Sequence, residues 1–181
     1  METHVRIVGG VLLLALGACA HHARGPAGVP PSDTVGWRTA PLGAPAAAAP
    51  GTSAVLTRVQ ATPAAGYDRV AFDFAGPLPA YRVAFDGAPP RSCGSGDPVE
   101  LPGQAFLVVS FRGAAAHDQQ GRATIARRDI RLGLVALRAL TLFCDFEGDV
   151  SWALALPRAT RFRVAQPADA TRLLLDVEHP H

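Results

Sequence analysis

The stretch that decides the fold is Tyr67-Asp-Arg-Val-Ala-Phe-Asp-Phe-Ala-Gly-Pro-Leu-Pro-Ala-Tyr-Arg-Val-Ala-Phe85. Large apolar residues occupy alternate positions in each half of it: Val70, Phe72 and Phe74, then Tyr81, Val83 and Phe85. A period of two places these side chains on one face of a half-buried strand. Between the halves, Gly76-Pro-Leu-Pro79 has the composition of a turn. The stretch therefore predicts two strands joined by a short connection.

The same alternation recurs along the chain, at 150–156, 162–164 and 173–177. Ala105–Arg112 is apolar on both faces, as a central strand would be. The segment Leu132–Phe143 suits a short helix or a strand, and we expect a strand because an early glycine leaves little room for a capped helix. Eight or nine short strands with Pro/Gly turns and no helix predict an all-β fold, a small antiparallel β-sandwich.

Two segments interrupt the strands. Gly87–Gly103 is a long loop rich in turn residues, and Gly113–Arg128 is a polar insertion. Long loops on a rigid sandwich are where binding residues concentrate. We therefore expect functional residues in or beside these two loops.

The N-terminal segment has the pattern of an export signal. The apolar run Ile7–Ala18 is too short to span a bilayer, which takes about 20 residues, and it ends in Leu16-Gly-Ala-Cys19. The small residues before the cysteine resemble a bacterial lipobox, where the signal is removed and the cysteine is acylated, for example with palmitate. We expect a signal peptide over 1–18, lipidation of Cys19 and an extracytoplasmic, membrane-anchored protein. Because Ala20 is not aspartate, the outer membrane is favoured if the host has two membranes. An ordinary secretory signal is the alternative.

Residues 19–53 consist largely of Ala, Pro, Gly and Ser. Their prolines forbid a long helix, so the lipidated cysteine and this stretch are expected to form a disordered tether. The sandwich would then occupy residues 54–181. Trp37 is a lone aromatic residue in the tether. We expect its side chain to pack either on a membrane surface or on the domain.

Lipidation of Cys19 leaves two further cysteines, Cys93 and Cys144, which are 51 positions apart. In an oxidising compartment an even pair favours a disulfide. Such a bond would remove about 4 kcal/mol of loop entropy from the unfolded chain. Two buried free thiols are the alternative, because sequence does not show whether the Cα atoms come within bonding range.

The 181 residues are 49% hydrophobic and 18% charged, which is typical of a globular chain. The net charge is +2, and the chain contains no lysine. Its arginines are interspersed with carboxylates and form no basic stripe, so nucleic-acid binding is excluded.

Several segments resemble the AMIN family: the strand Tyr67–Phe74, the hairpin end Tyr81–Val83 and the closing strand Thr171–Val177. Further segments resemble the AMIN-like lipoprotein group: Gly94–Val99, Ala116–Asp118 with Gly121, Asp145–Gly148 with Trp152, and Phe162–Val164. The resemblance covers about Val55 to His179. The chain departs from the pattern at Ala170-Thr171, where proline is usual, and at Ile125, where an aromatic residue is expected.

The resemblance implies a β-sandwich that acts as a non-catalytic module of the cell envelope and binds peptidoglycan or positions an envelope partner. The candidate ligand-binding residues are charged, polar or aromatic: Arg82, His117, Asp118, Arg131, Arg138, Glu147 and Trp152. Arginine suits peptide carboxylates, and an aromatic ring suits sugars. Each residue also has a structural interpretation; Trp152, for example, lies in an apolar register that favours the core.

A hydrolase would need His117 as a base and Glu147 as a catalytic carboxylate. Glu147 lies in a turn-like segment, however, and the chain has no nucleophile elbow, P-loop or HExxH motif. We therefore expect no catalytic residues, no metal and no cofactor. The alternative to peptidoglycan binding is a scaffold that binds protein by strand addition at a sheet edge, and a glycan hydrolase ranks after it.

Overall fold

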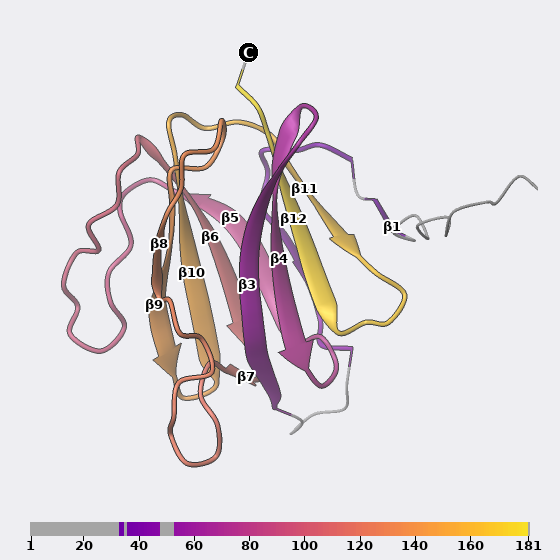
Figure 1. The fold of residues 1–181 in the computed structure, drawn as a ribbon, viewed down its shortest axis with the longest axis vertical. Coiled ribbons are helices and arrows are strands. Elements are labelled where there is room, and N and C mark those ends of the chain that lie inside the picture. The colour runs from indigo at the N-terminus through magenta and orange to yellow at the C-terminus, as the bar shows by residue number, and fades with distance from the viewer. Residues whose placement is uncertain (1–32, 35, 48–52, 181) are drawn as a thin grey trace, which may run out of the picture.

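A computed structural model describes residues 33–34, 36–47 and 53–180. Their regular structure consists of strands, arranged in two layers that face each other (Figure 1). The predicted all-β, antiparallel sandwich is confirmed. Among the described residues, no helix has the length and apolar character needed to cross a membrane.

The first layer, sheet A, has six strands in the order β1-β11-β12-β4-β3-β7. Their bounds are Asp33–Thr34, Phe162–Gln166, Arg172–Glu178, Tyr67–Ala75, Ala54–Ala64 and Ala114–Ala115. The pairs are antiparallel except for the short parallel pairing of β3 with β7. Sheet A lies in front in Figure 1.

The second layer, sheet B, has the order β2-β5-β6-β10-β9-β8 and is antiparallel throughout. Its strands are Leu42–Ala44, Ala80–Asp86, Ala105–Arg112, Asp149–Leu156, Ala139–Phe146 and Asp129–Arg131. The stretch 67–86 thus contributes β4 to one sheet and β5 to the other. Its Gly-Pro turn carries the chain from one layer to the next.

The core lies between the sheets and follows the predicted alternation. Phe72 of β4 packs on Phe111 of β6 with 5.2 Å between ring centroids, and on Trp152 of β10 at 6.3 Å. All three side chains are fully buried. Burying one such side chain contributes about 1.5–3 kcal/mol. This aromatic cluster joins the two sheets.

The segment Leu132–Phe143 is a strand only from Ala139 onward. Before that point, the buried carboxylate of Asp68 accepts hydrogen bonds from the backbone N–H groups of Ala136 and Leu137, at 2.6 and 3.1 Å. His179 binds the other oxygen of Asp68 at 3.0 Å. Donors held by a side chain cannot join a strand ladder, so residues 132–138 form a loop.

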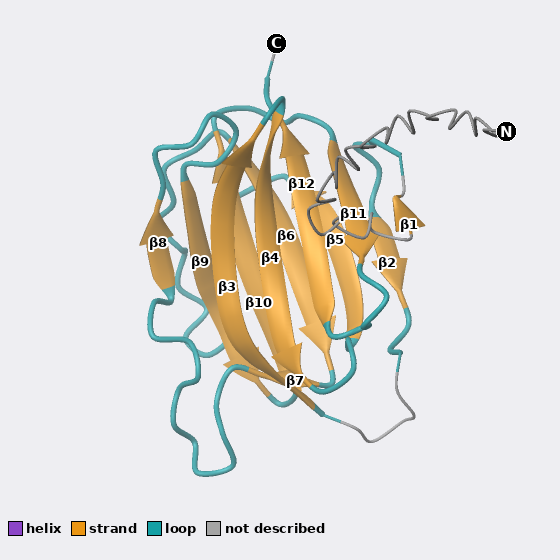
Figure 2. Cartoon of the chain, turned by 45° about the vertical axis from the view of Figure 1, so that its right-hand side comes forward, coloured by secondary structure: helices purple, strands orange, loops and turns teal. Residues whose placement is uncertain are grey.

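Part of the predicted tether pairs with the sandwich. β1 extends sheet A beside β11 and β2 extends sheet B beside β5, and both lie on the same side of the molecule (Figure 2). Trp37 packs on the domain: its ring lies 6.0 Å from that of Tyr67, and the Arg163 guanidinium lies over it at 4.5 Å. The predicted free segment is therefore shorter than 19–53. Cys19 and the signal segment lie outside the described residues.

The long loop 87–104 lies against sheet B. Cys93 and Cys144 form a disulfide with 5.2 Å between their Cα atoms, which decides between the two alternatives left by the sequence. At the end of the loop, a Cβ atom on Gly103 would come within 2.7 Å of the Leu156 carbonyl oxygen. A glycine is therefore required for the loop to approach β10 so closely.

Candidate functional site

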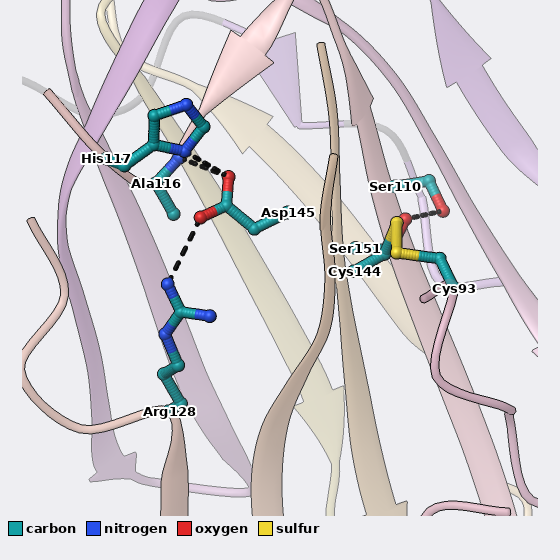
Figure 3. Close-up of a disulfide and its surroundings, with 8 residues drawn as sticks. All are labelled: Cys93, Ser110, Ala116, His117, Arg128, Cys144, Asp145 and Ser151. Carbon is teal, nitrogen blue, oxygen red and sulfur yellow. Dashed lines mark hydrogen bonds and ion pairs between the residues drawn. A yellow bond between two sulfur atoms is a disulfide. The ribbon is translucent and has the colours of Figure 1, made fainter. Parts of the chain in front are cut away.

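A buried carboxylate gathers three donors at one end of sheet B. Asp145 lies on β9, and its side chain is only 5% exposed. Its Oδ1 accepts the backbone N–H of Ala116 at 2.9 Å and lies 3.0 Å from Nδ1 of His117. Its Oδ2 accepts a hydrogen bond from Nη2 of Arg128 at 3.2 Å (Figure 3). Cys144, the preceding residue, points to the opposite side of the strand.

These contacts explain why Asp145 is tolerated out of water. A buried carboxylate is costly unless hydrogen-bond donors and a positive charge replace its hydration. The backbone amide, the imidazole and the guanidinium do so here. Asp145 therefore ties the beginning and the end of the polar insertion 113–128 to β9, which makes it an anchor for this loop.

The tip of the insertion is folded by Asp118. Its Oδ1 accepts the backbone N–H groups of Gln120 and Arg122, both at 2.9 Å, and its Oδ2 accepts Nε of Arg122 at 2.7 Å. The backbone N–H of Arg122 is the largest cause of a lowered pKa for Asp118, supported by its guanidinium and by the N–H of Gln120. These bonds give Asp118 the role of a turn former.

A groove of about 350 Å³ runs beside the Asp145 cluster. The disulfide, Asp145, Arg128 and Phe146 are among the residues that line it. The ring of Phe146 is 59% exposed, although phenylalanine is normally buried. An exposed ring beside a half-exposed arginine matches the two features that hold sugars and peptide carboxylates.

The turn after Phe146 fixes the position of this ring. Glu147 and Gly148 have φ values of 50° and 83°, which is the backbone of a two-residue type I′ hairpin between β9 and β10. The carbonyl oxygen of Gly148 accepts N–H bonds from Gly113 and Ala114, at 2.8 and 2.9 Å. The hairpin and the insertion are therefore held at the same end of the sandwich.

Residues 54–179 match the family model described as the AMIN-like domain. The chain belongs to the AMIN-like family. This confirms the predicted resemblance, and membership indicates a cell-envelope role associated with peptidoglycan. No curated protein and no solved structure matches the chain.

The AMIN-like fold brings some of the predicted residues together. His117, Asp118 and Glu147 all belong to the insertion or to the hairpin beside it. His117 binds Asp145, and within the described residues no hydrogen bond or ion pair joins it to Glu147. Nor do the described residues contain a group of three metal-ligating side chains.

The other predicted residues lie elsewhere. Arg82 is exposed on β5, Arg131 is exposed on the short edge strand β8, and Arg138 reaches the carbonyl oxygen of Leu134 at 3.3 Å. Trp152 is fully buried, so the interpretation of this residue as a surface platform is wrong. Trp152 lies in the apolar alternation of β10, and this pattern favoured a place in the core.

Three residues that line the groove are absent from the ligand-binding residues predicted from the sequence: Arg128, Asp145 and Phe146. One signal was present, because Phe146 is a large apolar residue inside an otherwise polar turn segment, Cys144-Asp-Phe-Glu-Gly-Asp149. The contact of Arg128 with Asp145 has no such signal, since 17 positions separate the two residues.

Proposed function

We propose that the chain is a lipoprotein of the cell envelope whose AMIN-like domain binds peptidoglycan without catalysing a reaction. The proposed parts are a signal peptide over 1–18, an acylated Cys19 followed by a tether within 19–53, and a domain over 54–181. The apolar run before Cys19 supports export, and so does the disulfide, because disulfides persist in oxidising compartments. The 13 residues 20–32 would span at most about 45 Å between the anchor and β1.

The observation that carries the proposal is the family match over residues 54–179. The groove beside Asp145 supports it with suitable chemistry. Phe146 offers an apolar face to a sugar ring, and Arg128 offers a guanidinium fork to a stem-peptide carboxylate. Because Asp145 holds Arg128 in place, little side-chain entropy would be lost on binding.

Sedimentation with purified cell-wall sacculi tests this binding. The full chain carrying Cys19→Ala, which lacks the acceptor thiol, should pellet with sacculi, and Phe146→Ala should weaken retention several-fold. Val135→Ala is the matched control, because Val135 is the other large hydrophobic side chain exposed among the described residues, at 53%. Equal retention of the two variants would remove Phe146 from the site. Failure of the parent chain to pellet would refute peptidoglycan binding.

The anchor is tested separately. The intact mass of the native protein should show removal of residues 1–18 and fatty acids on Cys19. Without reductant the mass should be lower by the two hydrogen atoms that the two thiols lose when they form the disulfide. Membrane fractionation of a diderm host should place the protein in the outer membrane, because Ala20 follows the cysteine. An uncleaved chain without fatty acid would overturn the lipoprotein assignment.

A second candidate function, protein binding by strand addition, is favoured by one observation. β3 spans Ala54–Ala64, but β7 pairs only with Ala54 and Val55. Within the described residues, the rest of this edge has no partner strand, and unpaired N–H and C=O groups can template another chain. Pro63 and Arg58 on β3 act against such pairing. Recovery of one stoichiometric cross-linked protein, without retention on sacculi, would favour this candidate.

A further inference from the structure

The arginines of the two sheets differ in how they are paired. On the outer face of sheet A, Arg69 and Arg163 share the buried carboxylate of Asp176 at 2.6–2.9 Å, and Arg172 pairs with Asp73. The side chain of Arg82, on β5 of sheet B, forms no ion pair or hydrogen bond within the part of the chain that the structure describes. A guanidinium without a partner is available to a ligand from outside.

The strands beside Arg82 leave room around its side chain. Tyr81 and Val83 point into the core, so Arg82 between them points outward. Its register neighbours are Gly43 on β2 and Ser110 on β6, both with little or no side chain. Hollows of about 410 and 330 Å³ consequently lie on its two sides. Arg82 lines both of them.

A second cation, Arg112, lies on β6 next to Arg82. Arg112 follows Ser110 by two positions on β6, so it projects from the same face and is a diagonal neighbour of Arg82, roughly 7–8 Å away between Cα atoms. Its contact with Asp149 is 4.0 Å long and largely exposed, which makes that ion pair weak. Both guanidinium groups therefore border the 330 Å³ hollow.

Ser110 adds one hydroxyl group to the lining of the hollow. The Ser110 and Ser151 hydroxyl groups are hydrogen-bonded to each other at 2.9 Å, next to the Cys93–Cys144 disulfide (Figure 3). A hydroxyl of this pair can donate to an oxyanion, because each hydroxyl has one proton and two lone pairs. Two cations and a hydroxyl donor are a suitable set for a carboxylate. The rest of the lining is mostly apolar, and Ala80 is part of it.

We infer that Arg82, Arg112 and Ser110 form a subsite for a peptide carboxylate next to a small apolar side chain. This rests on the proposed function, and it identifies the stem peptide of peptidoglycan as the part that this face binds. A volume near 330 Å³ lies at the lower end for ligand sites, so it accommodates one or two amino-acid residues and not a whole disaccharide-peptide.

A membrane surface fits this face less well. Recognition of anionic lipid headgroups usually relies on clusters of four to eight basic residues. Here two arginines border the hollow, and one of them, Arg112, has the carboxylate of Asp149 opposite it on β10. The cations are thus local and flank a hollow, which favours one small oxyanion over a flat charged surface.

The test is a calorimetric titration of the full chain carrying Cys19→Ala with a soluble disaccharide-tetrapeptide. The same compound with amidated carboxylates is the second probe, and it should bind at least ten-fold more weakly. Arg82→Ala should weaken binding of the first probe about ten- to a hundred-fold, since a charged hydrogen bond is lost, and Arg82→Lys should fall in between. Arg158→Ala is the matched control, because Arg158 is exposed on another turn.

The outcomes separate the subsite from the general function. Equal binding by Arg82→Ala and its parent, with normal retention on sacculi, would overturn the subsite and leave peptidoglycan binding intact. No binding of either probe and no retention on sacculi would refute both. If Arg82→Ala instead lost only binding to vesicles of anionic phospholipid, the face would be a membrane contact and the inference would be wrong. Unchanged melting temperatures exclude a folding defect.

Discussion

The disulfide allows a quantitative prediction about stability. Cys93 and Cys144 are 51 positions apart, so the bond removes about 4 kcal/mol of loop entropy from the unfolded chain at 25 °C. At about 2 cal/mol/K per residue, a domain of about 130 residues has an unfolding entropy of roughly 0.27 kcal/mol/K, and the stability change divided by this entropy gives the shift in melting temperature. The double variant Cys93→Ser/Cys144→Ser should therefore melt about 15 °C lower than its parent. It should still fold, because the aromatic core between the sheets does not involve either cysteine.

Circular dichroism melts of the full chain carrying Cys19→Ala measure this difference. Reductant should lower the melting temperature of the parent to that of the double variant, and it should leave the double variant unaffected. The loop 87–104, released from β9, should also become sensitive to protease. A decrease of less than about 4 °C would show that the chain-entropy argument does not apply here.

Two further predictions concern buried polar groups. Asp68→Ala leaves the N–H groups of Ala136 and Leu137 without their acceptor, so it should lower the free energy of unfolding by about 2–4 kcal/mol in urea titrations. Asp68→Asn should lower it by less. A decrease below about 1 kcal/mol for the alanine variant would contradict this prediction. The pKa of Tyr81 is raised by burial, partly offset by its hydrogen bond with Gln166. As the pH rises, the unfolded chain loses this phenolic proton before the folded chain does, so the free energy of unfolding should fall above about pH 10. Tyr81→Phe should reduce the slope of that fall. An unchanged slope would show that other groups cause the pH dependence.

The sequence alone determined the strands with clear apolar alternation, such as β4 and β10, because alternation along one strand is a local property of the pleated backbone. It did not reveal β1 or β2, which lie in the predicted tether. Val70, Phe72 and Phe74 point inward whatever strand lies beside them, and Trp152 could be placed in the core by the same rule. The family motifs are likewise contiguous segments that can be identified without a structure. The candidate site could be located in part, since His117, Asp118 and Glu147 come from loops that interrupt the strand pattern.

Only the tertiary structure decided which residues meet across strands. Strand order and register depend on the packing of the whole sandwich, and a shift of one residue would exchange the two faces of a strand. Asp145 gathers Ala116, His117 and Arg128 from positions 17 to 29 residues away, and Asp176 neutralises Arg69 across 107 positions. The same register leaves Arg82 between a glycine and a serine, and so without a charged partner.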